Sequence, residues 1–244
     1  MKLLKKNILI TGGAGGIGSE LVKKLAVRNQ VIVLDKNLKS IQKFVDDIEG
    51  KKLNVKFFAC DISDLTKTNQ LLEDINLKYG KIDVLINNAA IQRVGDFLET
   101  EFIDVLNTNI IGTMNLTKLV VKNMISGGMV FNVLSVHAFV TRRHKISYDV
   151  SKAALLMFTK ELALELAPKG ITVNAISMGA CKTKMNDDWL NNASAVANVK
   201  RKIPLGKIES AREVAKQIVN LLENFCNQTT GSNFVIDQGR SLRG

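Results

Sequence analysis

Short apolar segments alternate with longer mixed segments along this chain. Most of the apolar segments are hydrophobic at consecutive positions, which is typical of parallel strands that are covered on both faces. They predict strands at Asn7–Thr11, Gln30–Asp35, Val55–Cys60, Val84–Asn87, Gly128–Ser135, Thr172–Ser177 and Phe234–Asp237. The segments between them predict helices at Gly16–Asn29, Leu38–Ile48, Lys67–Lys78, Phe97–Met124, Ser147–Leu166 and Ala211–Phe225.

This alternation predicts an α/β fold in which right-handed crossovers build a doubly wound parallel sheet of about seven strands flanked by helices. A chain of 244 residues is compatible with one domain over residues 1–244. One extended mixed segment, Lys184–Ile208, precedes the last helix. We expect residues of about 180–210 to form a substrate loop above the carboxyl ends of the strands, where ligands bind in such folds.

Cysteine and histidine usage excludes several classes of site. The three cysteines are scattered without a close pair, which indicates reduced thiols. The two histidines are too few for a histidine-based metal cluster, so no metal is predicted. The basic start Met1–Lys6 leads into only a short apolar run, and no run approaches the roughly 18 apolar residues of a membrane helix. We therefore expect a cytoplasmic protein without a membrane partner.

The net charge of +11 has two interpretations. One is a nucleic-acid or membrane-surface partner, and the other is a lysine-rich solvated surface. The basic residues are spread along the chain and mixed with acids, without the 5–8-residue basic run that favours nucleic acid. The pattern favours the solvated surface, so no nucleic-acid partner is predicted.

The first strand runs into a glycine-rich loop, Thr11-Gly12-Gly13-Ala14-Gly15-Gly16-Ile17-Gly18, which opens a helix. Glycines let the backbone approach a pyrophosphate, and the helix N-terminus supplies free N–H groups and the positive end of a dipole. Both G-x-G-x-x-G and T-G-x-x-x-G-x-G fit this segment. Its place between a strand and a helix predicts a dinucleotide site and hence a Rossmann-like sheet.

Asp35 ends the second strand, 17 residues after Gly18. An acid there accepts hydrogen bonds from both ribose hydroxyls and repels a 2′-phosphate, which favours NAD over NADP. Lys36 follows directly and weakens this preference, because a cation can pair with the phosphate. NADP is therefore the less favoured alternative.

Tyr148 and Lys152 are four residues apart and share one face of a predicted helix. A phenol has a reference pKa near 10. A neighbouring ammonium stabilises the phenolate and lowers that pKa, so the pair forms an acid/base device.

The order of these motifs resembles the short-chain dehydrogenase/reductase family over nearly the whole chain. The motifs are Thr11-Gly12-x-x-x-Gly16-x-Gly18, Asp61-Ile62, Asn87-Asn88-Ala89, Asn109, Ser135, Tyr148-x-x-x-Lys152, and Asn174-Ala175-Ile176-Ser177-Met178-Gly179 reaching Thr183. Ser135 lies 13 residues before Tyr148, the usual interval in the family.

The resemblance implies a catalytic group of four residues. Tyr148 would exchange a proton with the substrate oxygen, and Lys152 would lower the phenol pKa and bind the nicotinamide ribose. Ser135 would hold the substrate oxygen against Tyr148. Asn109 would place a water that relays protons from Lys152 to solvent.

The resemblance also implies a set of cofactor-binding residues from the loops after successive strands. Asp61 and Ile62 would lie at the adenine, Asn87 and Ala89 at a ribose, and Gly179, Cys181 and Thr183 near the carboxamide. The predicted cofactor set is Thr11, Gly12, Gly15, Gly16, Ile17, Gly18, Asp35, Lys36, Asp61, Ile62, Asn87, Ala89, Tyr148, Lys152, Gly179, Cys181 and Thr183.

Two residues depart from the family pattern. Ala90 stands where glycine is usual, and Met178 where proline is usual. A methyl at residue 90 crowds the cofactor channel slightly, and loss of the proline frees the loop before Thr183. Neither change removes an acid/base group.

The segments after the fourth, fifth and sixth strands should line the substrate pocket. Their polar and aromatic residues include Arg93, His137, Arg142 and Trp189. Arginine suits bidentate pairing with a carboxylate or phosphate, so we predict a polar or anionic substrate such as a sugar derivative or a hydroxy acid. The alternative is that Arg142, Arg143 and Lys145 form a solvated turn.

The reaction predicted is hydride transfer between NAD(H) and a secondary alcohol or ketone. Two other functions stay open. Reduction of 3-ketoacyl groups on an acidic carrier protein fits the basic charge, but the segment before the fifth strand lacks docking cations and Asp35 disfavours NADPH. A dinucleotide-sensing protein would not need all four catalytic residues.

The resemblance also implies a homotetramer or homodimer built on the helices that carry Asn109 and Tyr148. The apolar residues expected on that face are Leu116, Val120, Leu155, Phe158 and Leu162. The other interpretation is that they pack against their own sheet.

Overall fold

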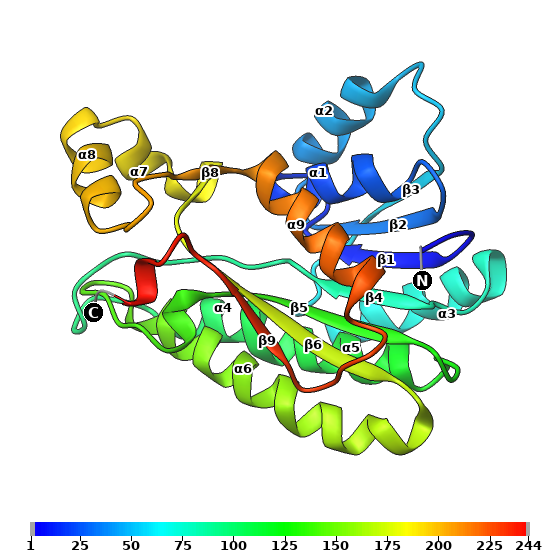
Figure 1. Cartoon of the computed structure of the whole chain (residues 1–244). Coiled ribbons are helices and arrows are strands. Elements are labelled where there is room, and N and C mark those ends of the chain that lie inside the picture. The colour runs from blue at the N-terminus through cyan, green and yellow to red at the C-terminus, as the bar shows by residue number, and fades with distance from the viewer. Residues whose placement is uncertain (1–2, 243–244) are drawn as a thin grey trace.

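The computed structural model describes residues 3–242. It confirms the predicted α/β architecture, with one parallel sheet between two layers of helices (Figure 1). Met1, Lys2, Arg243 and Gly244, which the single-domain prediction over residues 1–244 includes, lie outside the described residues.

The main sheet has seven strands in the order β3-β2-β1-β4-β5-β6-β9, and every pairing is parallel. The strands are β1 Asn7–Thr11, β2 Gln30–Asp35, β3 Val55–Ala59, β4 Val84–Asn87, β5 Met129–Ser135, β6 Thr172–Met178 and β9 Asn233–Ile236. All seven lie within one or two residues of the predicted ranges. The strand order reverses between β1 and β4, so a crevice opens at their carboxyl ends.

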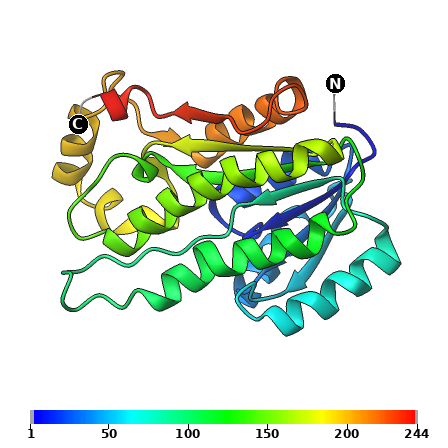
Figure 2. The same cartoon turned by 90° about the horizontal axis from the view of Figure 1, so that it is seen from below.

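Two helical layers cover the sheet, as Figure 2 shows from below. One layer contains α1 (Gly16–Leu25), α2 (Leu38–Ile48) and α9 (Ala211–Asn224). The other contains α3 (Leu65–Tyr79), α5 (Thr113–Val121) and α6 (Ile146–Leu166). Each layer buries its own apolar cluster against one face of the sheet. This double coverage explains why the central strands are apolar at consecutive positions.

The single helix predicted over Phe97–Met124 is wrong in its first part. The chain becomes helical only at α4 (Ile103–Leu106), passes through a π-helical turn, η1 (Asn107–Gly112), and then continues as α5. The aromatic rings of Phe97 and Phe102 pack on each other at a centroid distance of 5.9 Å instead of facing the core. The apolar pattern there therefore reflects a local cluster and not a helix face.

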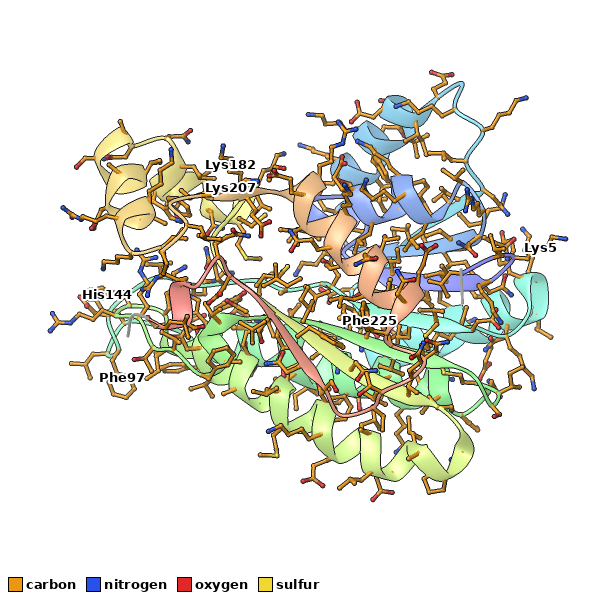
Figure 3. All side chains as sticks on the ribbon, viewed as in Figure 1. Lys5, Phe97, His144, Lys182, Lys207 and Phe225 are labelled. Carbon is orange, nitrogen blue, oxygen red and sulfur yellow. The ribbon has the colours of Figure 1, made fainter. Side chains whose placement is uncertain are left out.

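The segment after β6 forms a small helical subregion over the carboxyl ends of the strands. It contains η4 (Lys184–Asn186), α7 (Asp187–Leu190) and α8 (Ala193–Arg201), which project from the body in Figure 1. The two-residue strands β7 (Cys181–Lys182) and β8 (Glu209–Ser210) pair in parallel at its base, where Figure 3 labels Lys182 and Lys207. This pairing brings the start and the end of the helical subregion side by side.

The apolar residues expected at an interface between copies are buried or half-buried in this chain. Leu116, Val120 and Leu155 are buried, and Phe158 and Leu162 are half-buried against the core, which agrees with the alternative that they pack against their own sheet. The outward side of α6 instead carries Val150, Met157 and Leu164, which are exposed. Within residues 3–242, no helix is long and apolar enough to cross a membrane.

Helix α3 offers a matched test of the core. Ile75 is 1% exposed in the cluster below the sheet, whereas Leu77, two residues later, is 86% exposed. Ile75→Ala should lower the free energy of unfolding by about 2–5 kcal/mol, because it removes buried methyl groups and leaves a cavity. Leu77→Ala should change it by less than about 0.5 kcal/mol. Urea denaturation of both variants checks this, and equal losses would contradict the assigned face of α3.

Candidate active site

The glycine loop and the end of β4 are tied together by hydrogen bonds. The backbone N–H groups of Asn88 and Ala89 donate to Thr11 Oγ1, each at 3.0 Å. The Asn88 side-chain amide donates back to the carbonyls of Thr11 and Gly12, also at 3.0 Å. The mouth of the crevice between β1 and β4 is therefore held at a fixed width.

Two glycines are required by close packing at this junction. Gly12 has φ +63°, and a Cβ there would lie 2.9 Å from the Ala89 Cα. A Cβ on Gly18 would collide with the Gly12 carbonyl oxygen and approach the Asn88 amide nitrogen to 2.7 Å. Any side chain would push the loop away from β4, so the glycine pattern has a steric cause.

A cleft runs along this junction, and most of the predicted cofactor residues line it. They are Gly12, Gly15, Gly16, Ile17, Asp35, Lys36, Asp61, Ile62, Ala89, Tyr148, Lys152 and Thr183. These residues come from the ends of different strands and meet because the parallel strands all end on the same side. The cleft is thus long enough to run from the end of β2 to the start of α6.

Five predicted cofactor residues lie behind the cleft wall: Thr11, Gly18, Asn87, Gly179 and Cys181. Thr11 and Gly18 hold the glycine loop close to the segment after β4, as described above. Gly179 is pressed against β9, where a Cβ would lie 2.9 Å from the Asp237 Cα. The Cys181 thiol is buried, and burial raises its pKa to about 12.

Asn87 differs most from its expected place. Its side-chain amide points into the core, where it donates to Thr117 Oγ1 at 3.0 Å and to Asn132 Oδ1 at 2.8 Å. The adjacent Asn88, which the predicted set omitted, lines the cleft instead. Consecutive strand residues point to opposite faces, so only one of the two asparagines can face the cleft.

Asp35 lies in the cleft with its carboxylate held by the backbone. Its Oδ2 accepts the N–H of Ala14 at 3.1 Å, and its Oδ1 accepts that of Asn37 at 3.0 Å. The neighbouring Lys36 ammonium lies 3.7 Å from Asp61 Oδ2. Lys36 is therefore directed across this part of the cleft towards an acid.

Tyr148 and Lys152 line the cleft away from Asp35, and the Ser135 side chain lies within hydrogen-bond reach of Tyr148. Tyr148 and Lys152 lie one turn apart on α6, and Ser135 ends β5, which packs beneath that helix. The Lys152 ammonium is 5.6 Å from the centre of the Tyr148 ring and donates to the Val133 carbonyl at 2.9 Å. The Ser135 hydroxyl accepts the N–H of His137 at 3.2 Å. The expected catalytic residues are thus adjacent in space.

Burial shifts the pKa of both ionisable groups of this cluster towards the neutral form. It raises the pKa of Tyr148 to about 12, an effect that the hydrogen bond with Ser135 opposes and the charge of Asp149 increases. It lowers the pKa of Lys152 to about 8. A buried phenol needs a nearby positive charge to ionise at neutral pH.

Asn109 lies in the π-helical turn η1 and is almost fully buried. Its amide accepts from the N–H of Ile91 at 2.9 Å and donates to the Ile91 carbonyl at 2.9 Å. It also donates to Ser151 Oγ at 3.0 Å, which in turn donates to the carbonyl of Tyr148 at 2.7 Å. Asn109 therefore joins three segments around the catalytic helix, and π-helical turns are frequent at functional sites.

The four predicted substrate residues do not converge on one point. The Arg93 guanidinium is 2.6 Å from Asp104 Oδ2, so its charge is already paired. Arg142 is exposed. Trp189 donates from its ring N–H to Asn186 Oδ1 at 3.1 Å, within the segment after β6. Of this set, only His137 contacts a catalytic side chain.

His137 and Asp149 hold the loop between Ser135 and Tyr148. His137 Nδ1 lies 2.9 Å from Asp149 Oδ1, and the His137 ring meets the Tyr148 ring edge-on at a centroid distance of 6.0 Å. The other oxygen of Asp149 accepts the N–H of Arg142 at 3.1 Å. One carboxylate therefore contacts both the start and the middle of this loop.

Lys145, for which a solvated turn was the alternative interpretation of the sequence, is buried in the structure. Its ammonium donates to Gln92 Oε1 at 2.9 Å, and Gln92 donates from its amide to the Met185 carbonyl. The only signal in the sequence is its position three residues before Tyr148, one helical turn away.

Comparison with known proteins agrees with this geometry. The family model described as short chain dehydrogenase matches residues 6–194. The 3-oxoacyl-[acyl-carrier-protein] reductase FabG of Thermotoga maritima is 33% identical over 245 residues, spanning 98% of this chain and 99% of that protein. Carbonyl reductase family member 4 of Danio rerio is 32% identical over 239 residues, spanning 96% of this chain and 97% of that protein.

Solved structures give the same result. A dehydrogenase/reductase from Sinorhizobium meliloti superposes with a TM-score of 0.90 at 27% identity, over 98% of this chain and 96% of that one. A gluconate 5-dehydrogenase from Burkholderia cenocepacia, with a TM-score of 0.92 at 23% identity over 99% and 97% of the two chains, shares the fold. The chain belongs to the short-chain dehydrogenase/reductase family and is an oxidoreductase that acts on CH–OH groups.

Proposed function

We propose that this oxidoreductase transfers a hydride between NAD(H) and a secondary alcohol or ketone, with Tyr148 as the acid/base. The observation that carries the proposal is that Tyr148 and Lys152, with Ser135 hydrogen-bonded to the phenol, lie in a cleft that Asp35 also lines. The bound nicotinamide would supply the hydride chemistry, and the protein would supply position and charge.

In the oxidative direction the residues would act in a fixed order. The Ser135 hydroxyl would hydrogen-bond to the substrate oxygen and hold it against Tyr148. The Tyr148 phenolate would accept the alcohol proton while the carbinol hydrogen leaves with its electron pair to the nicotinamide, which gives a ketone. Lys152 would stabilise the phenolate, and Asn109 would hold the loop through which the proton returns to solvent.

The position of Asp35 supports NAD as the cofactor. Its carboxylate is fixed by two backbone N–H groups beside the glycine loop, so it cannot move away from a ribose 2′ substituent without losing them. Lys36, the cation that would favour a 2′-phosphate, is directed towards Asp61. A negative charge held at this point favours a free ribose diol over a phosphate.

We further propose a polar or anionic small-molecule substrate. The loops around Tyr148 carry basic side chains on several segments, including His137, Lys145 and Lys184. Reduction of 3-ketoacyl groups on a carrier protein is the second candidate, because the relative from Thermotoga maritima bears that name at 33% identity. The identity of the substrate decides between the two.

Assembly into a homotetramer or homodimer is also proposed. The exposed apolar residues Val150, Met157 and Leu164 lie along the outward side of α6, and Ile111 and Met114 lie on the neighbouring η1 and α5. Two copies of such a face can bury each other across a twofold axis.

Tyr148→Phe tests the mechanism directly. The variant keeps the ring and loses the hydroxyl, so turnover of any substrate should fall by at least about 100-fold. The dissociation constant for NADH, measured by fluorescence titration, should stay within about twofold. Retained turnover, followed at the nicotinamide absorbance with a panel of alcohols, hydroxy acids and sugar derivatives, would exclude Tyr148 as the acid/base.

Lys152→Met should change the pH dependence of alcohol oxidation. Burial, the charge of Asp149 and the opposing hydrogen bond with Ser135 place the pKa of Tyr148 at about 12, a value to which the charge of Lys152 does not contribute, and the base must be deprotonated to act. Without the ammonium, the phenolate fraction should rise about tenfold per pH unit up to pH 10. The wild type should level off at lower pH, because the positive charge of Lys152 lowers the pKa of the phenol. Measurement of kcat/KM between pH 6 and 10 checks this, and parallel profiles for the two proteins would refute the role of Lys152.

Asp35→Ala should weaken the preference for NAD. Loss of a charged acceptor for the ribose hydroxyls should lower kcat/KM with NAD about 10–100-fold, and removal of the negative charge should improve use of NADP. Lys36→Met is the matched control, because it removes a neighbouring charge of opposite sign and should not lower kcat/KM with NAD. Assays with both cofactors in parallel decide; an unchanged ratio in Asp35→Ala would show that Asp35 does not set cofactor choice.

A further inference from the structure

Among the residues that the structure describes, Lys145 is a buried ammonium without a carboxylate partner. The residue is only 8% exposed. Within residues 3–242, no carboxylate oxygen lies within 4.0 Å of its nitrogen. Its one hydrogen-bond acceptor in the described residues is the neutral Gln92 Oε1. A buried cation normally has an ion-pair partner, so this one is unusual.

The surroundings of Lys145 add positive charge. Desolvation and the charge of Arg142 lower its pKa, and only the more distant carboxylates of Asp149 and Asp188 raise it. Asp149 is already engaged by His137 and by the N–H of Arg142. Lys145 also precedes the first residue of α6, a helix of 21 residues, and the positive end of a helix dipole lies there. This point therefore favours an anion.

Lys145 is also close to the proposed acid/base along the chain. It caps the N-terminus of α6 and precedes Tyr148, which lies in the first turn of that helix, by three residues. Its hydrogen-bond partner Gln92 follows the cleft-lining Ile91 and donates to the carbonyl of Met185, which also lines the cleft. Gln92 thus links the ammonium to two segments of the cleft wall.

We propose that Lys145 binds the carboxylate of a small hydroxy acid or sugar acid whose secondary hydroxyl reacts at Tyr148. This inference rests on the proposed hydride transfer and names the substrate class of that site. A carboxylate would complete the buried ion pair, and Gln92 would hold the ammonium in place. A carrier-bound 3-ketoacyl group has a neutral thioester at the corresponding position, so it would leave Lys145 unpaired.

The test compares acids with neutral alcohols that have the same carbon skeleton. The pairs are lactate with 1,2-propanediol, 3-hydroxybutyrate with 1,3-butanediol, and gluconate with glucitol. The wild type should prefer the acid in at least one pair by about tenfold or more in kcat/KM, because charge-assisted hydrogen bonds are about twice as strong as neutral ones. The same compounds are titrated against the NADH-loaded enzyme, with fluorescence of the bound NADH as the binding signal.

Two variants separate charge from packing. Lys145→Met keeps the length of the side chain and should raise KM for the preferred acid at least about tenfold, with kcat and NADH affinity within about twofold. Gln92→Glu leaves the lysine in place but gives it a partner within the protein, so it should weaken acid binding as well. Arg143→Met removes an exposed cation two residues away and should leave the preference for acids intact.

Failure of this inference is distinct from failure of hydride transfer. Equal turnover and equal binding of acid and alcohol in every pair by the wild type would overturn the role of Lys145 and leave the reaction at Tyr148 standing. An equal rise in KM for both members of a pair in Lys145→Met would overturn it too, because it would show a purely structural role. Loss of the acid preference in Lys145→Met and in Gln92→Glu, but not in Arg143→Met, would support it.

Discussion

The hydrogen bonds between Thr11 and the Asn88-Ala89 backbone hold together the two halves of the sheet at the point where the strand order reverses. The amide of Asn88 returns two hydrogen bonds to the glycine loop. Because the loop is packed too closely for a side chain at Gly12 or Gly18, its distance from β4 is fixed. The glycine loop and Ala89, which are proposed to bind the cofactor, take their positions from this junction.

Burial is the second constraint, because it shifts the pKa values of the ionisable groups around Tyr148. The cluster at the start of α6 contains a phenol whose pKa is raised by burial and an ammonium whose pKa is lowered by it. Burial disfavours the ionised form of each group, whereas the charge of each group favours the ionised form of the other. The proposed acid/base function therefore requires the phenol and the ammonium to be held close together. Lys145 extends the same principle to the substrate side, since its buried charge lacks an ion-pair partner among the described residues.

Loops without regular secondary structure are held by single polar side chains. Asp149 contacts the start and the middle of the loop between Ser135 and Tyr148. Asn109 joins the segment after β4 to α6, and Gln92 joins that segment to the region after β6. These contacts place the catalytic and the proposed substrate-binding side chains on rigid supports, which keeps reacting groups in a productive geometry.

The sequence by itself determined the seven main strands, the glycine loop and the pairing of Tyr148 with Lys152, because strand alternation, turn chemistry and helical spacing depend on neighbouring residues. The resemblance to the family added the remaining members of the site. Only the tertiary structure decided that Asn87 points into the core, that Arg93 is paired with Asp104, that residues 97–102 are not helical, and that Lys145 is buried. These properties depend on contacts between segments that are distant in the chain, and local patterns carry no information about which of two neighbouring charges will be enclosed.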